Sequence, residues 1–143
     1  MPNALPRTTL TLLLVAGACA ALPLSIMAQQ QPSSAISVSQ TGAPKMPSVE
    51  EAKQTLLPEL EKSSRAVAVA TVKPVKLPAG PAIRISYGSN SDPNPVTNKA
   101  IRLENDRYYF WKDGKLVSVN FSAPAGADNA DQWDMMATTF RWR

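Results

Sequence analysis

The alternation of hydrophobic and polar residues predicts β-strands in the middle of the chain. Residues 66–72 alternate and are β-branched, and this strand can continue past Pro74 if it lies at the edge of a sheet. Residues 82–87 alternate cleanly, with Arg84 and Ser86 on the polar face. Such a pattern is typical of a half-buried antiparallel strand.

A loop over 88–99, with two prolines and four Asn or Asp residues, leads into an aromatic hairpin. The strand over 100–112 changes the phase of its apolar residues, so we expect a bulge near Asn105 and Asp106. Asp113-Gly114 is a two-residue hairpin turn. Counting outward from it puts two apolar sets on opposite faces: Phe110, Val117, Tyr108, Val119 and Phe121 on one, and Trp111, Leu116, Tyr109 and Ser118 on the other. We therefore expect a sheet covered on both sides.

A helix is predicted before these strands, over about 49–63. Ser48 and Glu51 have the spacing of a capping box, in which each side chain bonds the backbone N–H of the other. Pro58 interrupts the apolar face, so we expect the helix to kink or end near Leu57.

A second helix is predicted after the strands. Asp128 or Asn129 caps it, and its buried face follows helical spacing through Trp133, Met136, Ala137 and Phe140. The expected fold class is α+β, an antiparallel β-sheet meander flanked by an N-terminal and a C-terminal helix.

The N-terminal 28 residues have the pattern of a secretory signal. Arg7 precedes an apolar run over 10–22, and small residues follow. A helix that spans a membrane needs about 20 apolar residues, so we expect cleavage after Ala28. The alternatives are lipidation at Cys19, which follows Ala-Gly-Ala, and an N-terminal anchor that is not cleaved.

The expected organisation is a signal over 1–28, a flexible linker over 29–47 and a single domain over 48–143. The linker is rich in Gln, Ser and Pro, with one short candidate strand at 35–40. Cleavage after Ala28 removes the only cysteine of the chain, so an apolar core alone must stabilise the domain.

Three stretches resemble a known family. They are Leu77–Ala82 with Tyr87, the Tyr-Tyr-Phe-Trp hairpin with its Asp-Gly turn, and the tail from Phe121 to Trp142. Over about residues 48–142 the chain resembles PsbP-like domains, the Mog1/PsbP-type α-β-α sandwich of bacterial exported proteins, lipoproteins and extrinsic photosystem subunits. The resemblance implies a non-catalytic accessory or binding role. Such domains usually open with further strands, so we expect a shortened domain or a sheet that lacks a part.

Composition excludes several chemistries. The chain has no histidine, which removes Ser-His-Asp and Cys-His nucleophiles and the commonest metal ligand. The six glycines form no phosphate loop. Without residues 1–28 the chain keeps 14 basic and 11 acidic residues, a scattered net charge of +3. We therefore expect no enzyme, no cofactor and no nucleic-acid partner.

Two sets of oxygen ligands are candidate cation sites. One is Asp128, Asp131 and Asp134, spaced by three. The other is Asp92 with Asn94 and Asn98. Helix capping and a solvated surface explain the first set better, and ordinary turns explain the second.

The function expected from the sequence is an exported accessory protein that docks on a membrane or envelope component. If aromatic residues are exposed, Tyr109, Trp111 and Trp142 are the candidates for a docking patch, although core packing is favoured. The alternative is a small-molecule or lipid carrier with a pocket between helix and sheet. A truncated relative without a function of its own is a further reading. The oligomeric state stays open.

Overall fold

The computed structural model describes residues 34–143, which contain five strands and two helices. The elements are β1 (Ala35–Gly42), α1 (Val49–Ser63), β2 (Arg65–Leu77), β3 (Gly80–Asn90), β4 (Arg102–Lys112), β5 (Lys115–Pro124) and α2 (Ala130–Thr139). The expected signal over 1–28 and the candidate lipidation site Cys19 lie outside the described residues.

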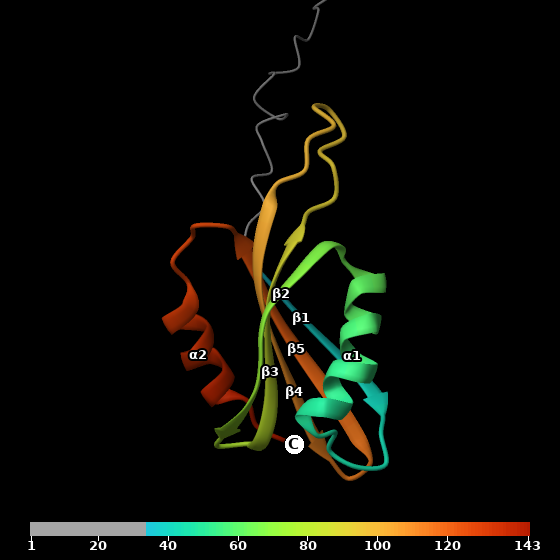
Figure 1. The fold of residues 1–143 in the computed structure, drawn as a ribbon. Helices are drawn as coiled ribbons and strands as arrows, with labels where there is room; N and C mark the ends of the chain where they lie inside the picture. The colour runs from blue at the N-terminus through green and yellow to red at the C-terminus, as the bar shows by residue number, and fades with distance from the viewer. Residues whose placement is uncertain (1–33) are drawn as a thin grey trace, which may run out of the picture. The chain divides into compact units, whose positions relative to one another are not determined.

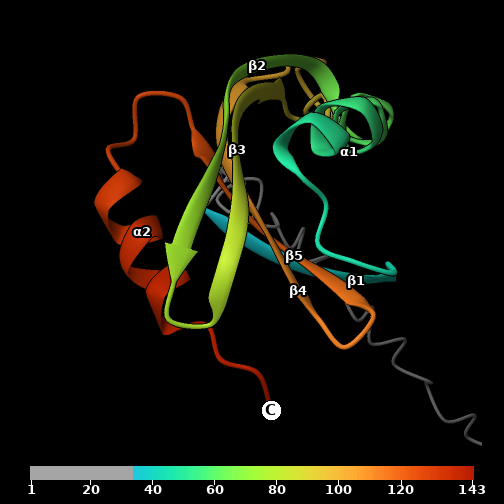
Figure 2. The ribbon, with the colours of Figure 1, turned by 60° about the horizontal axis from the view of Figure 1, so that its bottom comes forward.

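All strand pairs of the sheet are antiparallel, in the order β1-β5-β4-β3-β2. Strands β2 to β5 form the expected meander. The connection through α1 carries the chain from β1 at one edge to β2 at the other. Helices α1 and α2 lie on opposite sides of the sheet (Figures 1 and 2). The α+β class with one helix before and one after the meander is confirmed.

Strand β1 occupies part of the range expected as a linker. The candidate strand at 35–40 is confirmed and continues to Gly42, paired along its whole length with β5. Its alternation of apolar and hydroxyl side chains fits a strand, but the partner that makes it one lies about 80 residues later in the chain. The domain therefore begins before residue 48.

The β4–β5 hairpin has the expected register, with Trp111 opposite Leu116 and Tyr108 opposite Val119. Asp113 and Gly114 both have positive φ, as a type I′ turn requires. The bulge expected near Asn105 and Asp106 is wrong, because the pairing of β4 with both neighbours is continuous there. The change of phase has another cause. Both faces of β4 are covered, so both can carry apolar residues.

Helix α1 confirms the capping box, with the Ser48 hydroxyl accepting from the Glu51 N–H at 3.2 Å and Glu51 accepting from the Ser48 N–H at 2.8 Å. The helix expected over about 49–63 is confirmed, since it runs from Val49 through Pro58 to Ser63 and does not end near Leu57. Its buried residues lie on both sides of the proline, and their packing outweighs the lost hydrogen bond: Ala52, Leu56 and Leu60.

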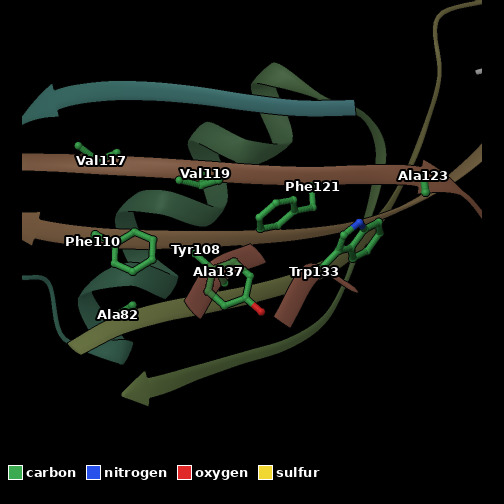
Figure 3. Packing of buried hydrophobic residues seen from close by; sticks show 9 residues of the cluster. All are labelled: Ala82, Tyr108, Phe110, Val117, Val119, Phe121, Ala123, Trp133 and Ala137. Atoms are coloured by element: carbon green, nitrogen blue, oxygen red, sulfur yellow. The ribbon is translucent and has the colours of Figure 1, made fainter. Parts of the chain in front are cut away.

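Two separate cores follow from the two helices. Under α1 the buried residues are Ala52, Leu56, Leu60, Ile83, Ile85, Tyr87, Tyr109 and Leu116. Under α2 they are Ala82, Tyr108, Phe110, Val117, Val119, Phe121, Ala123, Trp133 and Ala137 (Figure 3). We expected a sheet covered on both sides, because both faces of the hairpin carry apolar residues, and this expectation is confirmed.

Candidate functional site

An apolar groove runs between α2 and the edge strand β1. Its volume is about 250 Å³. On its outer side Ile36 and Val38 are 57% and 65% exposed, which is unusual for large apolar residues next to a core. Its walls and floor come from four elements: Ile36 and Val38 of β1, Tyr108 and Phe110 of β4, Val119 and Phe121 of β5, and Met136, Ala137, Thr139 and the following Phe140 at α2.

The groove exists because α2 is short and packs over residues of β3, β4 and β5, whereas Ile36 and Val38 of β1 stay exposed. The Trp133 ring stacks on Phe121 with centroids 6.2 Å apart, and Phe140 stacks on Phe110 at 4.3 Å. A ten-residue helix is marginal alone, so these contacts determine where α2 lies.

An ionic network, buried at the sheet and half-exposed at α2, joins α2 to the sheet beside this groove. Arg84 of β3 pairs with Asp106 of β4, and its Nη1 lies 3.0 Å from Oδ1 of Asp134 on α2. The Tyr108 hydroxyl donates to the same Asp134 oxygen at 2.7 Å, and the Ser86 hydroxyl donates to Asp106. Three elements are thus tied together by charge-assisted hydrogen bonds.

Burial shifts the acid–base behaviour of this network. Desolvation, and then the hydrogen bond to Asp134, raise the pKa of Tyr108 well above its ordinary value of 10. Desolvation lowers the pKa of Arg84, but the hydrogen bond and the charge of Asp106 outweigh it, so the net shift is upward. Both groups therefore stay protonated over the physiological range, and the network is a structural support for α2.

The polar face expected for β3 is not exposed to solvent. Arg84 is 16% exposed and the facing Asp106 side chain only 6%, because α2 covers this side of the sheet. The sequence signal for this pair is weak. An Arg and an Asp on the polar positions of two neighbouring strands can be matched only when the β3–β4 register is known.

The three candidate docking aromatics do not form one patch. Tyr109 is buried under α1, and Trp111 packs on the same core while its Nε1–H donates to the Ala43 carbonyl at 2.9 Å. Trp142 lies against the other core, and its Nε1–H donates to the Ala79 carbonyl at 3.1 Å. Core packing, which the sequence favoured for Tyr109, Trp111 and Trp142, agrees with these positions, because alternating residues of β4 face the α1 core while the C-terminal tail packs on the α2 core.

Three of the six candidate cation ligands are engaged in other contacts: Asp134, Asp92 and Asn94. Asp134 binds Arg84 and Tyr108, and Asp92 pairs with Arg65 at 3.1 Å. The Asn94 side chain accepts the backbone N–H groups of residues 96 and 97. Within residues 34–143, no three acidic side chains come together as a metal site would need.

A second hollow, of about 350 Å³, lies between the β1–α1 connection and α1. Its lining mixes apolar residues with charged ones such as Lys45, Glu51 and Glu59, and Lys45 and Glu51 pair with each other at 2.7 Å. Because Lys45 and Glu51 already bind each other, this hollow offers less to a ligand than the apolar groove. Over the part of the chain that the structure describes, neither helix has the length and apolar character needed to cross a bilayer.

Comparison with known proteins identifies the fold alone. No family model and no curated protein sequence matches the chain. Among solved structures, the chain is similar to protein PA94 from Pseudomonas aeruginosa, a protein of unknown function described as a candidate regulator. The TM-score is 0.59 at 9% sequence identity, over 78% of this chain and 76% of that one.

Proposed function

We propose that this chain is a PsbP-like domain of an exported protein, and that it acts as a non-enzymatic accessory module that docks on an envelope component. The groove between α2 and β1 is the docking site. It takes an apolar segment of the partner protein, which covers Ile36 and Val38 and packs against Met136 of α2.

The observation that carries this proposal is the exposure of Ile36 and Val38 beside a preformed apolar floor. Burial of a large aliphatic side chain is worth about 1.5–3 kcal/mol, so the two residues offer a partner considerable binding free energy. The floor is rigid, because stacked rings form it and the Arg84 network holds α2. The helix–sheet–helix arrangement is also what the PsbP resemblance implies.

A photo-crosslinking amino acid at Met136 tests the site. Met136 lines the groove, whereas the neighbouring Met135 is 69% exposed and does not line it, so position 135 is the matched control. Cells that express and export the protein are illuminated. Position 136 should give one dominant crosslinked adduct with another envelope protein, and position 135 should give little. Equal crosslinking at the two positions would argue against the groove as the docking site.

The alternative function is a carrier of a small molecule or lipid, and the apolar lining of the groove supports it. The volume of the groove is against it, because about 250 Å³ is below the roughly 300–1,000 Å³ of typical ligand pockets. Native mass spectrometry of the purified protein separates the two functions. A lipid retained at one copy per chain and lost in Met136→Asp would favour the carrier.

The export part of the proposal is tested by the intact mass of the protein recovered from the exporting host. We expect a chain that begins at Gln29, with the same result for Cys19→Ala. A chain that begins at an acylated Cys19 would show that the exported protein is attached to the membrane by a lipid and is not free. A full-length chain retained in the cytoplasm would contradict export.

A further inference from the structure

The two edges of the sheet are built differently. Strand β2 carries several features that prevent edge-to-edge pairing: the exposed Lys73, Pro74 and Lys76, positive φ at Ala66, and two register shifts in its pairing with β3. Charged side chains, proline and irregular pairing are the usual means of protecting an edge. This edge therefore stays unpaired.

Strand β1 has none of these features. Its eight residues, Ala-Ile-Ser-Val-Ser-Gln-Thr-Gly, include no charge and no proline, and its pairing with β5 has no register shift. All eight are exposed in the described part of the chain. A regular edge of this kind presents backbone N–H and C=O groups to any strand that approaches it.

We propose that a second copy of this chain pairs with β1 in an antiparallel fashion across a twofold axis, so that two five-stranded sheets become continuous. The strand is self-complementary, since apolar Ile36 and Val38 share the α2 face and hydroxyl residues share the other. Strand β1 has no charged residue, so two copies of it can pair without repulsion between like charges, whereas the β2 edge carries lysines. A twofold contact places each residue near its own copy, so the absence of charge removes one obstacle to association at β1.

The pattern of hydrogen bonds fixes which residues face the second copy. The Ala43 N–H donates to the Gly114 carbonyl, in register with the β1–β5 pairing. Backbone groups alternate in direction along an antiparallel strand, so those of Ile36, Val38 and Gln40 point outward.

Residues with outward backbone groups must form the hydrogen-bonded pairs, which allows twofold axes at Ser37, Val38 or Ser39. An axis at Ser37 places Ile36 opposite Val38 of the second copy, twice. An axis at Val38 places Val38 opposite its own copy and Ile36 opposite Gln40, and an axis at Ser39 places Val38 opposite Gln40. Apolar pairs stabilise a sheet more than an apolar residue opposite an amide, so the axis lies at Ser37.

The interface is small, because it consists of one short strand pair and four apolar side chains. Stable interfaces bury about 1,200–2,000 Å², so we expect a weak, concentration-dependent dimer. The pairing lies in the plane of the sheet and leaves the α2 face open. The two grooves then meet across the axis, and docking of a partner does not depend on the dimer.

Sedimentation of the full chain over a concentration series tests the proposal. Ser37→Glu places two like charges directly opposite each other across the axis, on the face of β1 away from the α2 groove, and like charges in that position destabilise a strand pair. Thr41→Glu adds the same charge to the same face of β1, roughly 27 Å from its copy, and is the matched control. We expect the wild type and Thr41→Glu to shift toward dimer, and Ser37→Glu to need a higher concentration to do so. A wild type that is monomeric throughout, or a Ser37→Glu variant that dimerises as Thr41→Glu does, would overturn the proposal.

A disulfide test covers the case in which Ser37→Glu fails to fold. In a Cys19→Ala background, Ser37→Cys places two thiols in a non-hydrogen-bonded pair with Cα atoms about 4.5 Å apart, within disulfide range. In Thr41→Cys they are roughly 27 Å apart. Mild oxidation with oxidised glutathione should crosslink Ser37→Cys and not Thr41→Cys. Equal crosslinking, or none in either, would contradict the axis at Ser37. Loss of the dimer leaves the adduct at position 136 unaffected, so the two proposals can fail separately.

Discussion

Arg84 on β3 and Asp134 on α2 form the ion pair that ties the C-terminal helix to the sheet, with 3.0 Å between Nη1 and Oδ1. The same guanidinium also pairs with the buried Asp106. Because α2 forms one wall of the apolar groove, this pair determines the shape of the groove without lining it. Arg84 does not line the groove, but it positions the helix that does.

Arg84→Met should destabilise the domain strongly. The substitution leaves the Asp106 carboxylate buried without its charged partner, which costs about 3–5 kcal/mol. The matched control is Arg65→Met, whose ion pair with Asp92 is exposed and should contribute less than about 1 kcal/mol. Urea unfolding followed by circular dichroism measures both. Adding Asp106→Leu to Arg84→Met should restore much of the loss, and equal effects of the two single arginine variants would contradict a structural role for the buried pair.

Asp134→Ala should loosen α2 while leaving the sheet intact. It removes the acceptor of both Arg84 and the Tyr108 hydroxyl, a loss of about 1–2 kcal/mol for a half-exposed charged group. Hydrogen exchange should accelerate over 130–139 and stay unchanged in β3 and β4. Asp131→Ala, on the exposed side of the same helix, is the control and should leave exchange nearly unaltered.

Stability should fall at alkaline pH because of Tyr108. Burial, and then the hydrogen bond to Asp134, raise its pKa above the ordinary 10, so the folded chain holds this proton more tightly than the unfolded chain does. The contribution is complete below pH 10 and is lost as the pH rises toward the folded-state pKa, with a slope of about 1.4 kcal/mol per pH unit for each proton. Burial raises the pKa of Tyr87 too, so Tyr108→Phe should reduce the slope without abolishing it. A slope that does not change in this variant would contradict the shift.

Local patterns were enough to predict the elements whose structure depends on near neighbours. The Asp113-Gly114 turn sets the register of the hairpin around it, and the Ser48–Glu51 capping box sets the start of α1. The helical spacing placed α1 correctly over 49–63, but neither the alternative end near Leu57 nor the bulge expected near Asn105 is present. In both places the packing of the helix, or the cover on both faces of β4, overrides the local preference.

The candidate site could not be predicted, because it depends on pairings distant in the chain. Ile36 and Val38 line the groove only because β1 pairs with β5, and Arg84 is buried only because α2 returns to cover β3. The residues Met136 and Phe140 were placed on the buried face of the last helix. The groove beside these two residues depends on the distance between α2 and β1, and no sequence pattern predicts that distance.

The central claim, that the groove docks the protein on an envelope component, is tested most directly by retention in the envelope fraction of the exporting host. Met136→Asp puts a charge into the groove, and Met135→Asp puts the same charge on the exposed side of the same helix. Thermal unfolding of both variants is the control that checks whether they fold. We predict that Met136→Asp is released at least about tenfold more than Met135→Asp, as the loss of about 1.4 kcal/mol of binding implies. Equal retention of the two folded variants would contradict the claim.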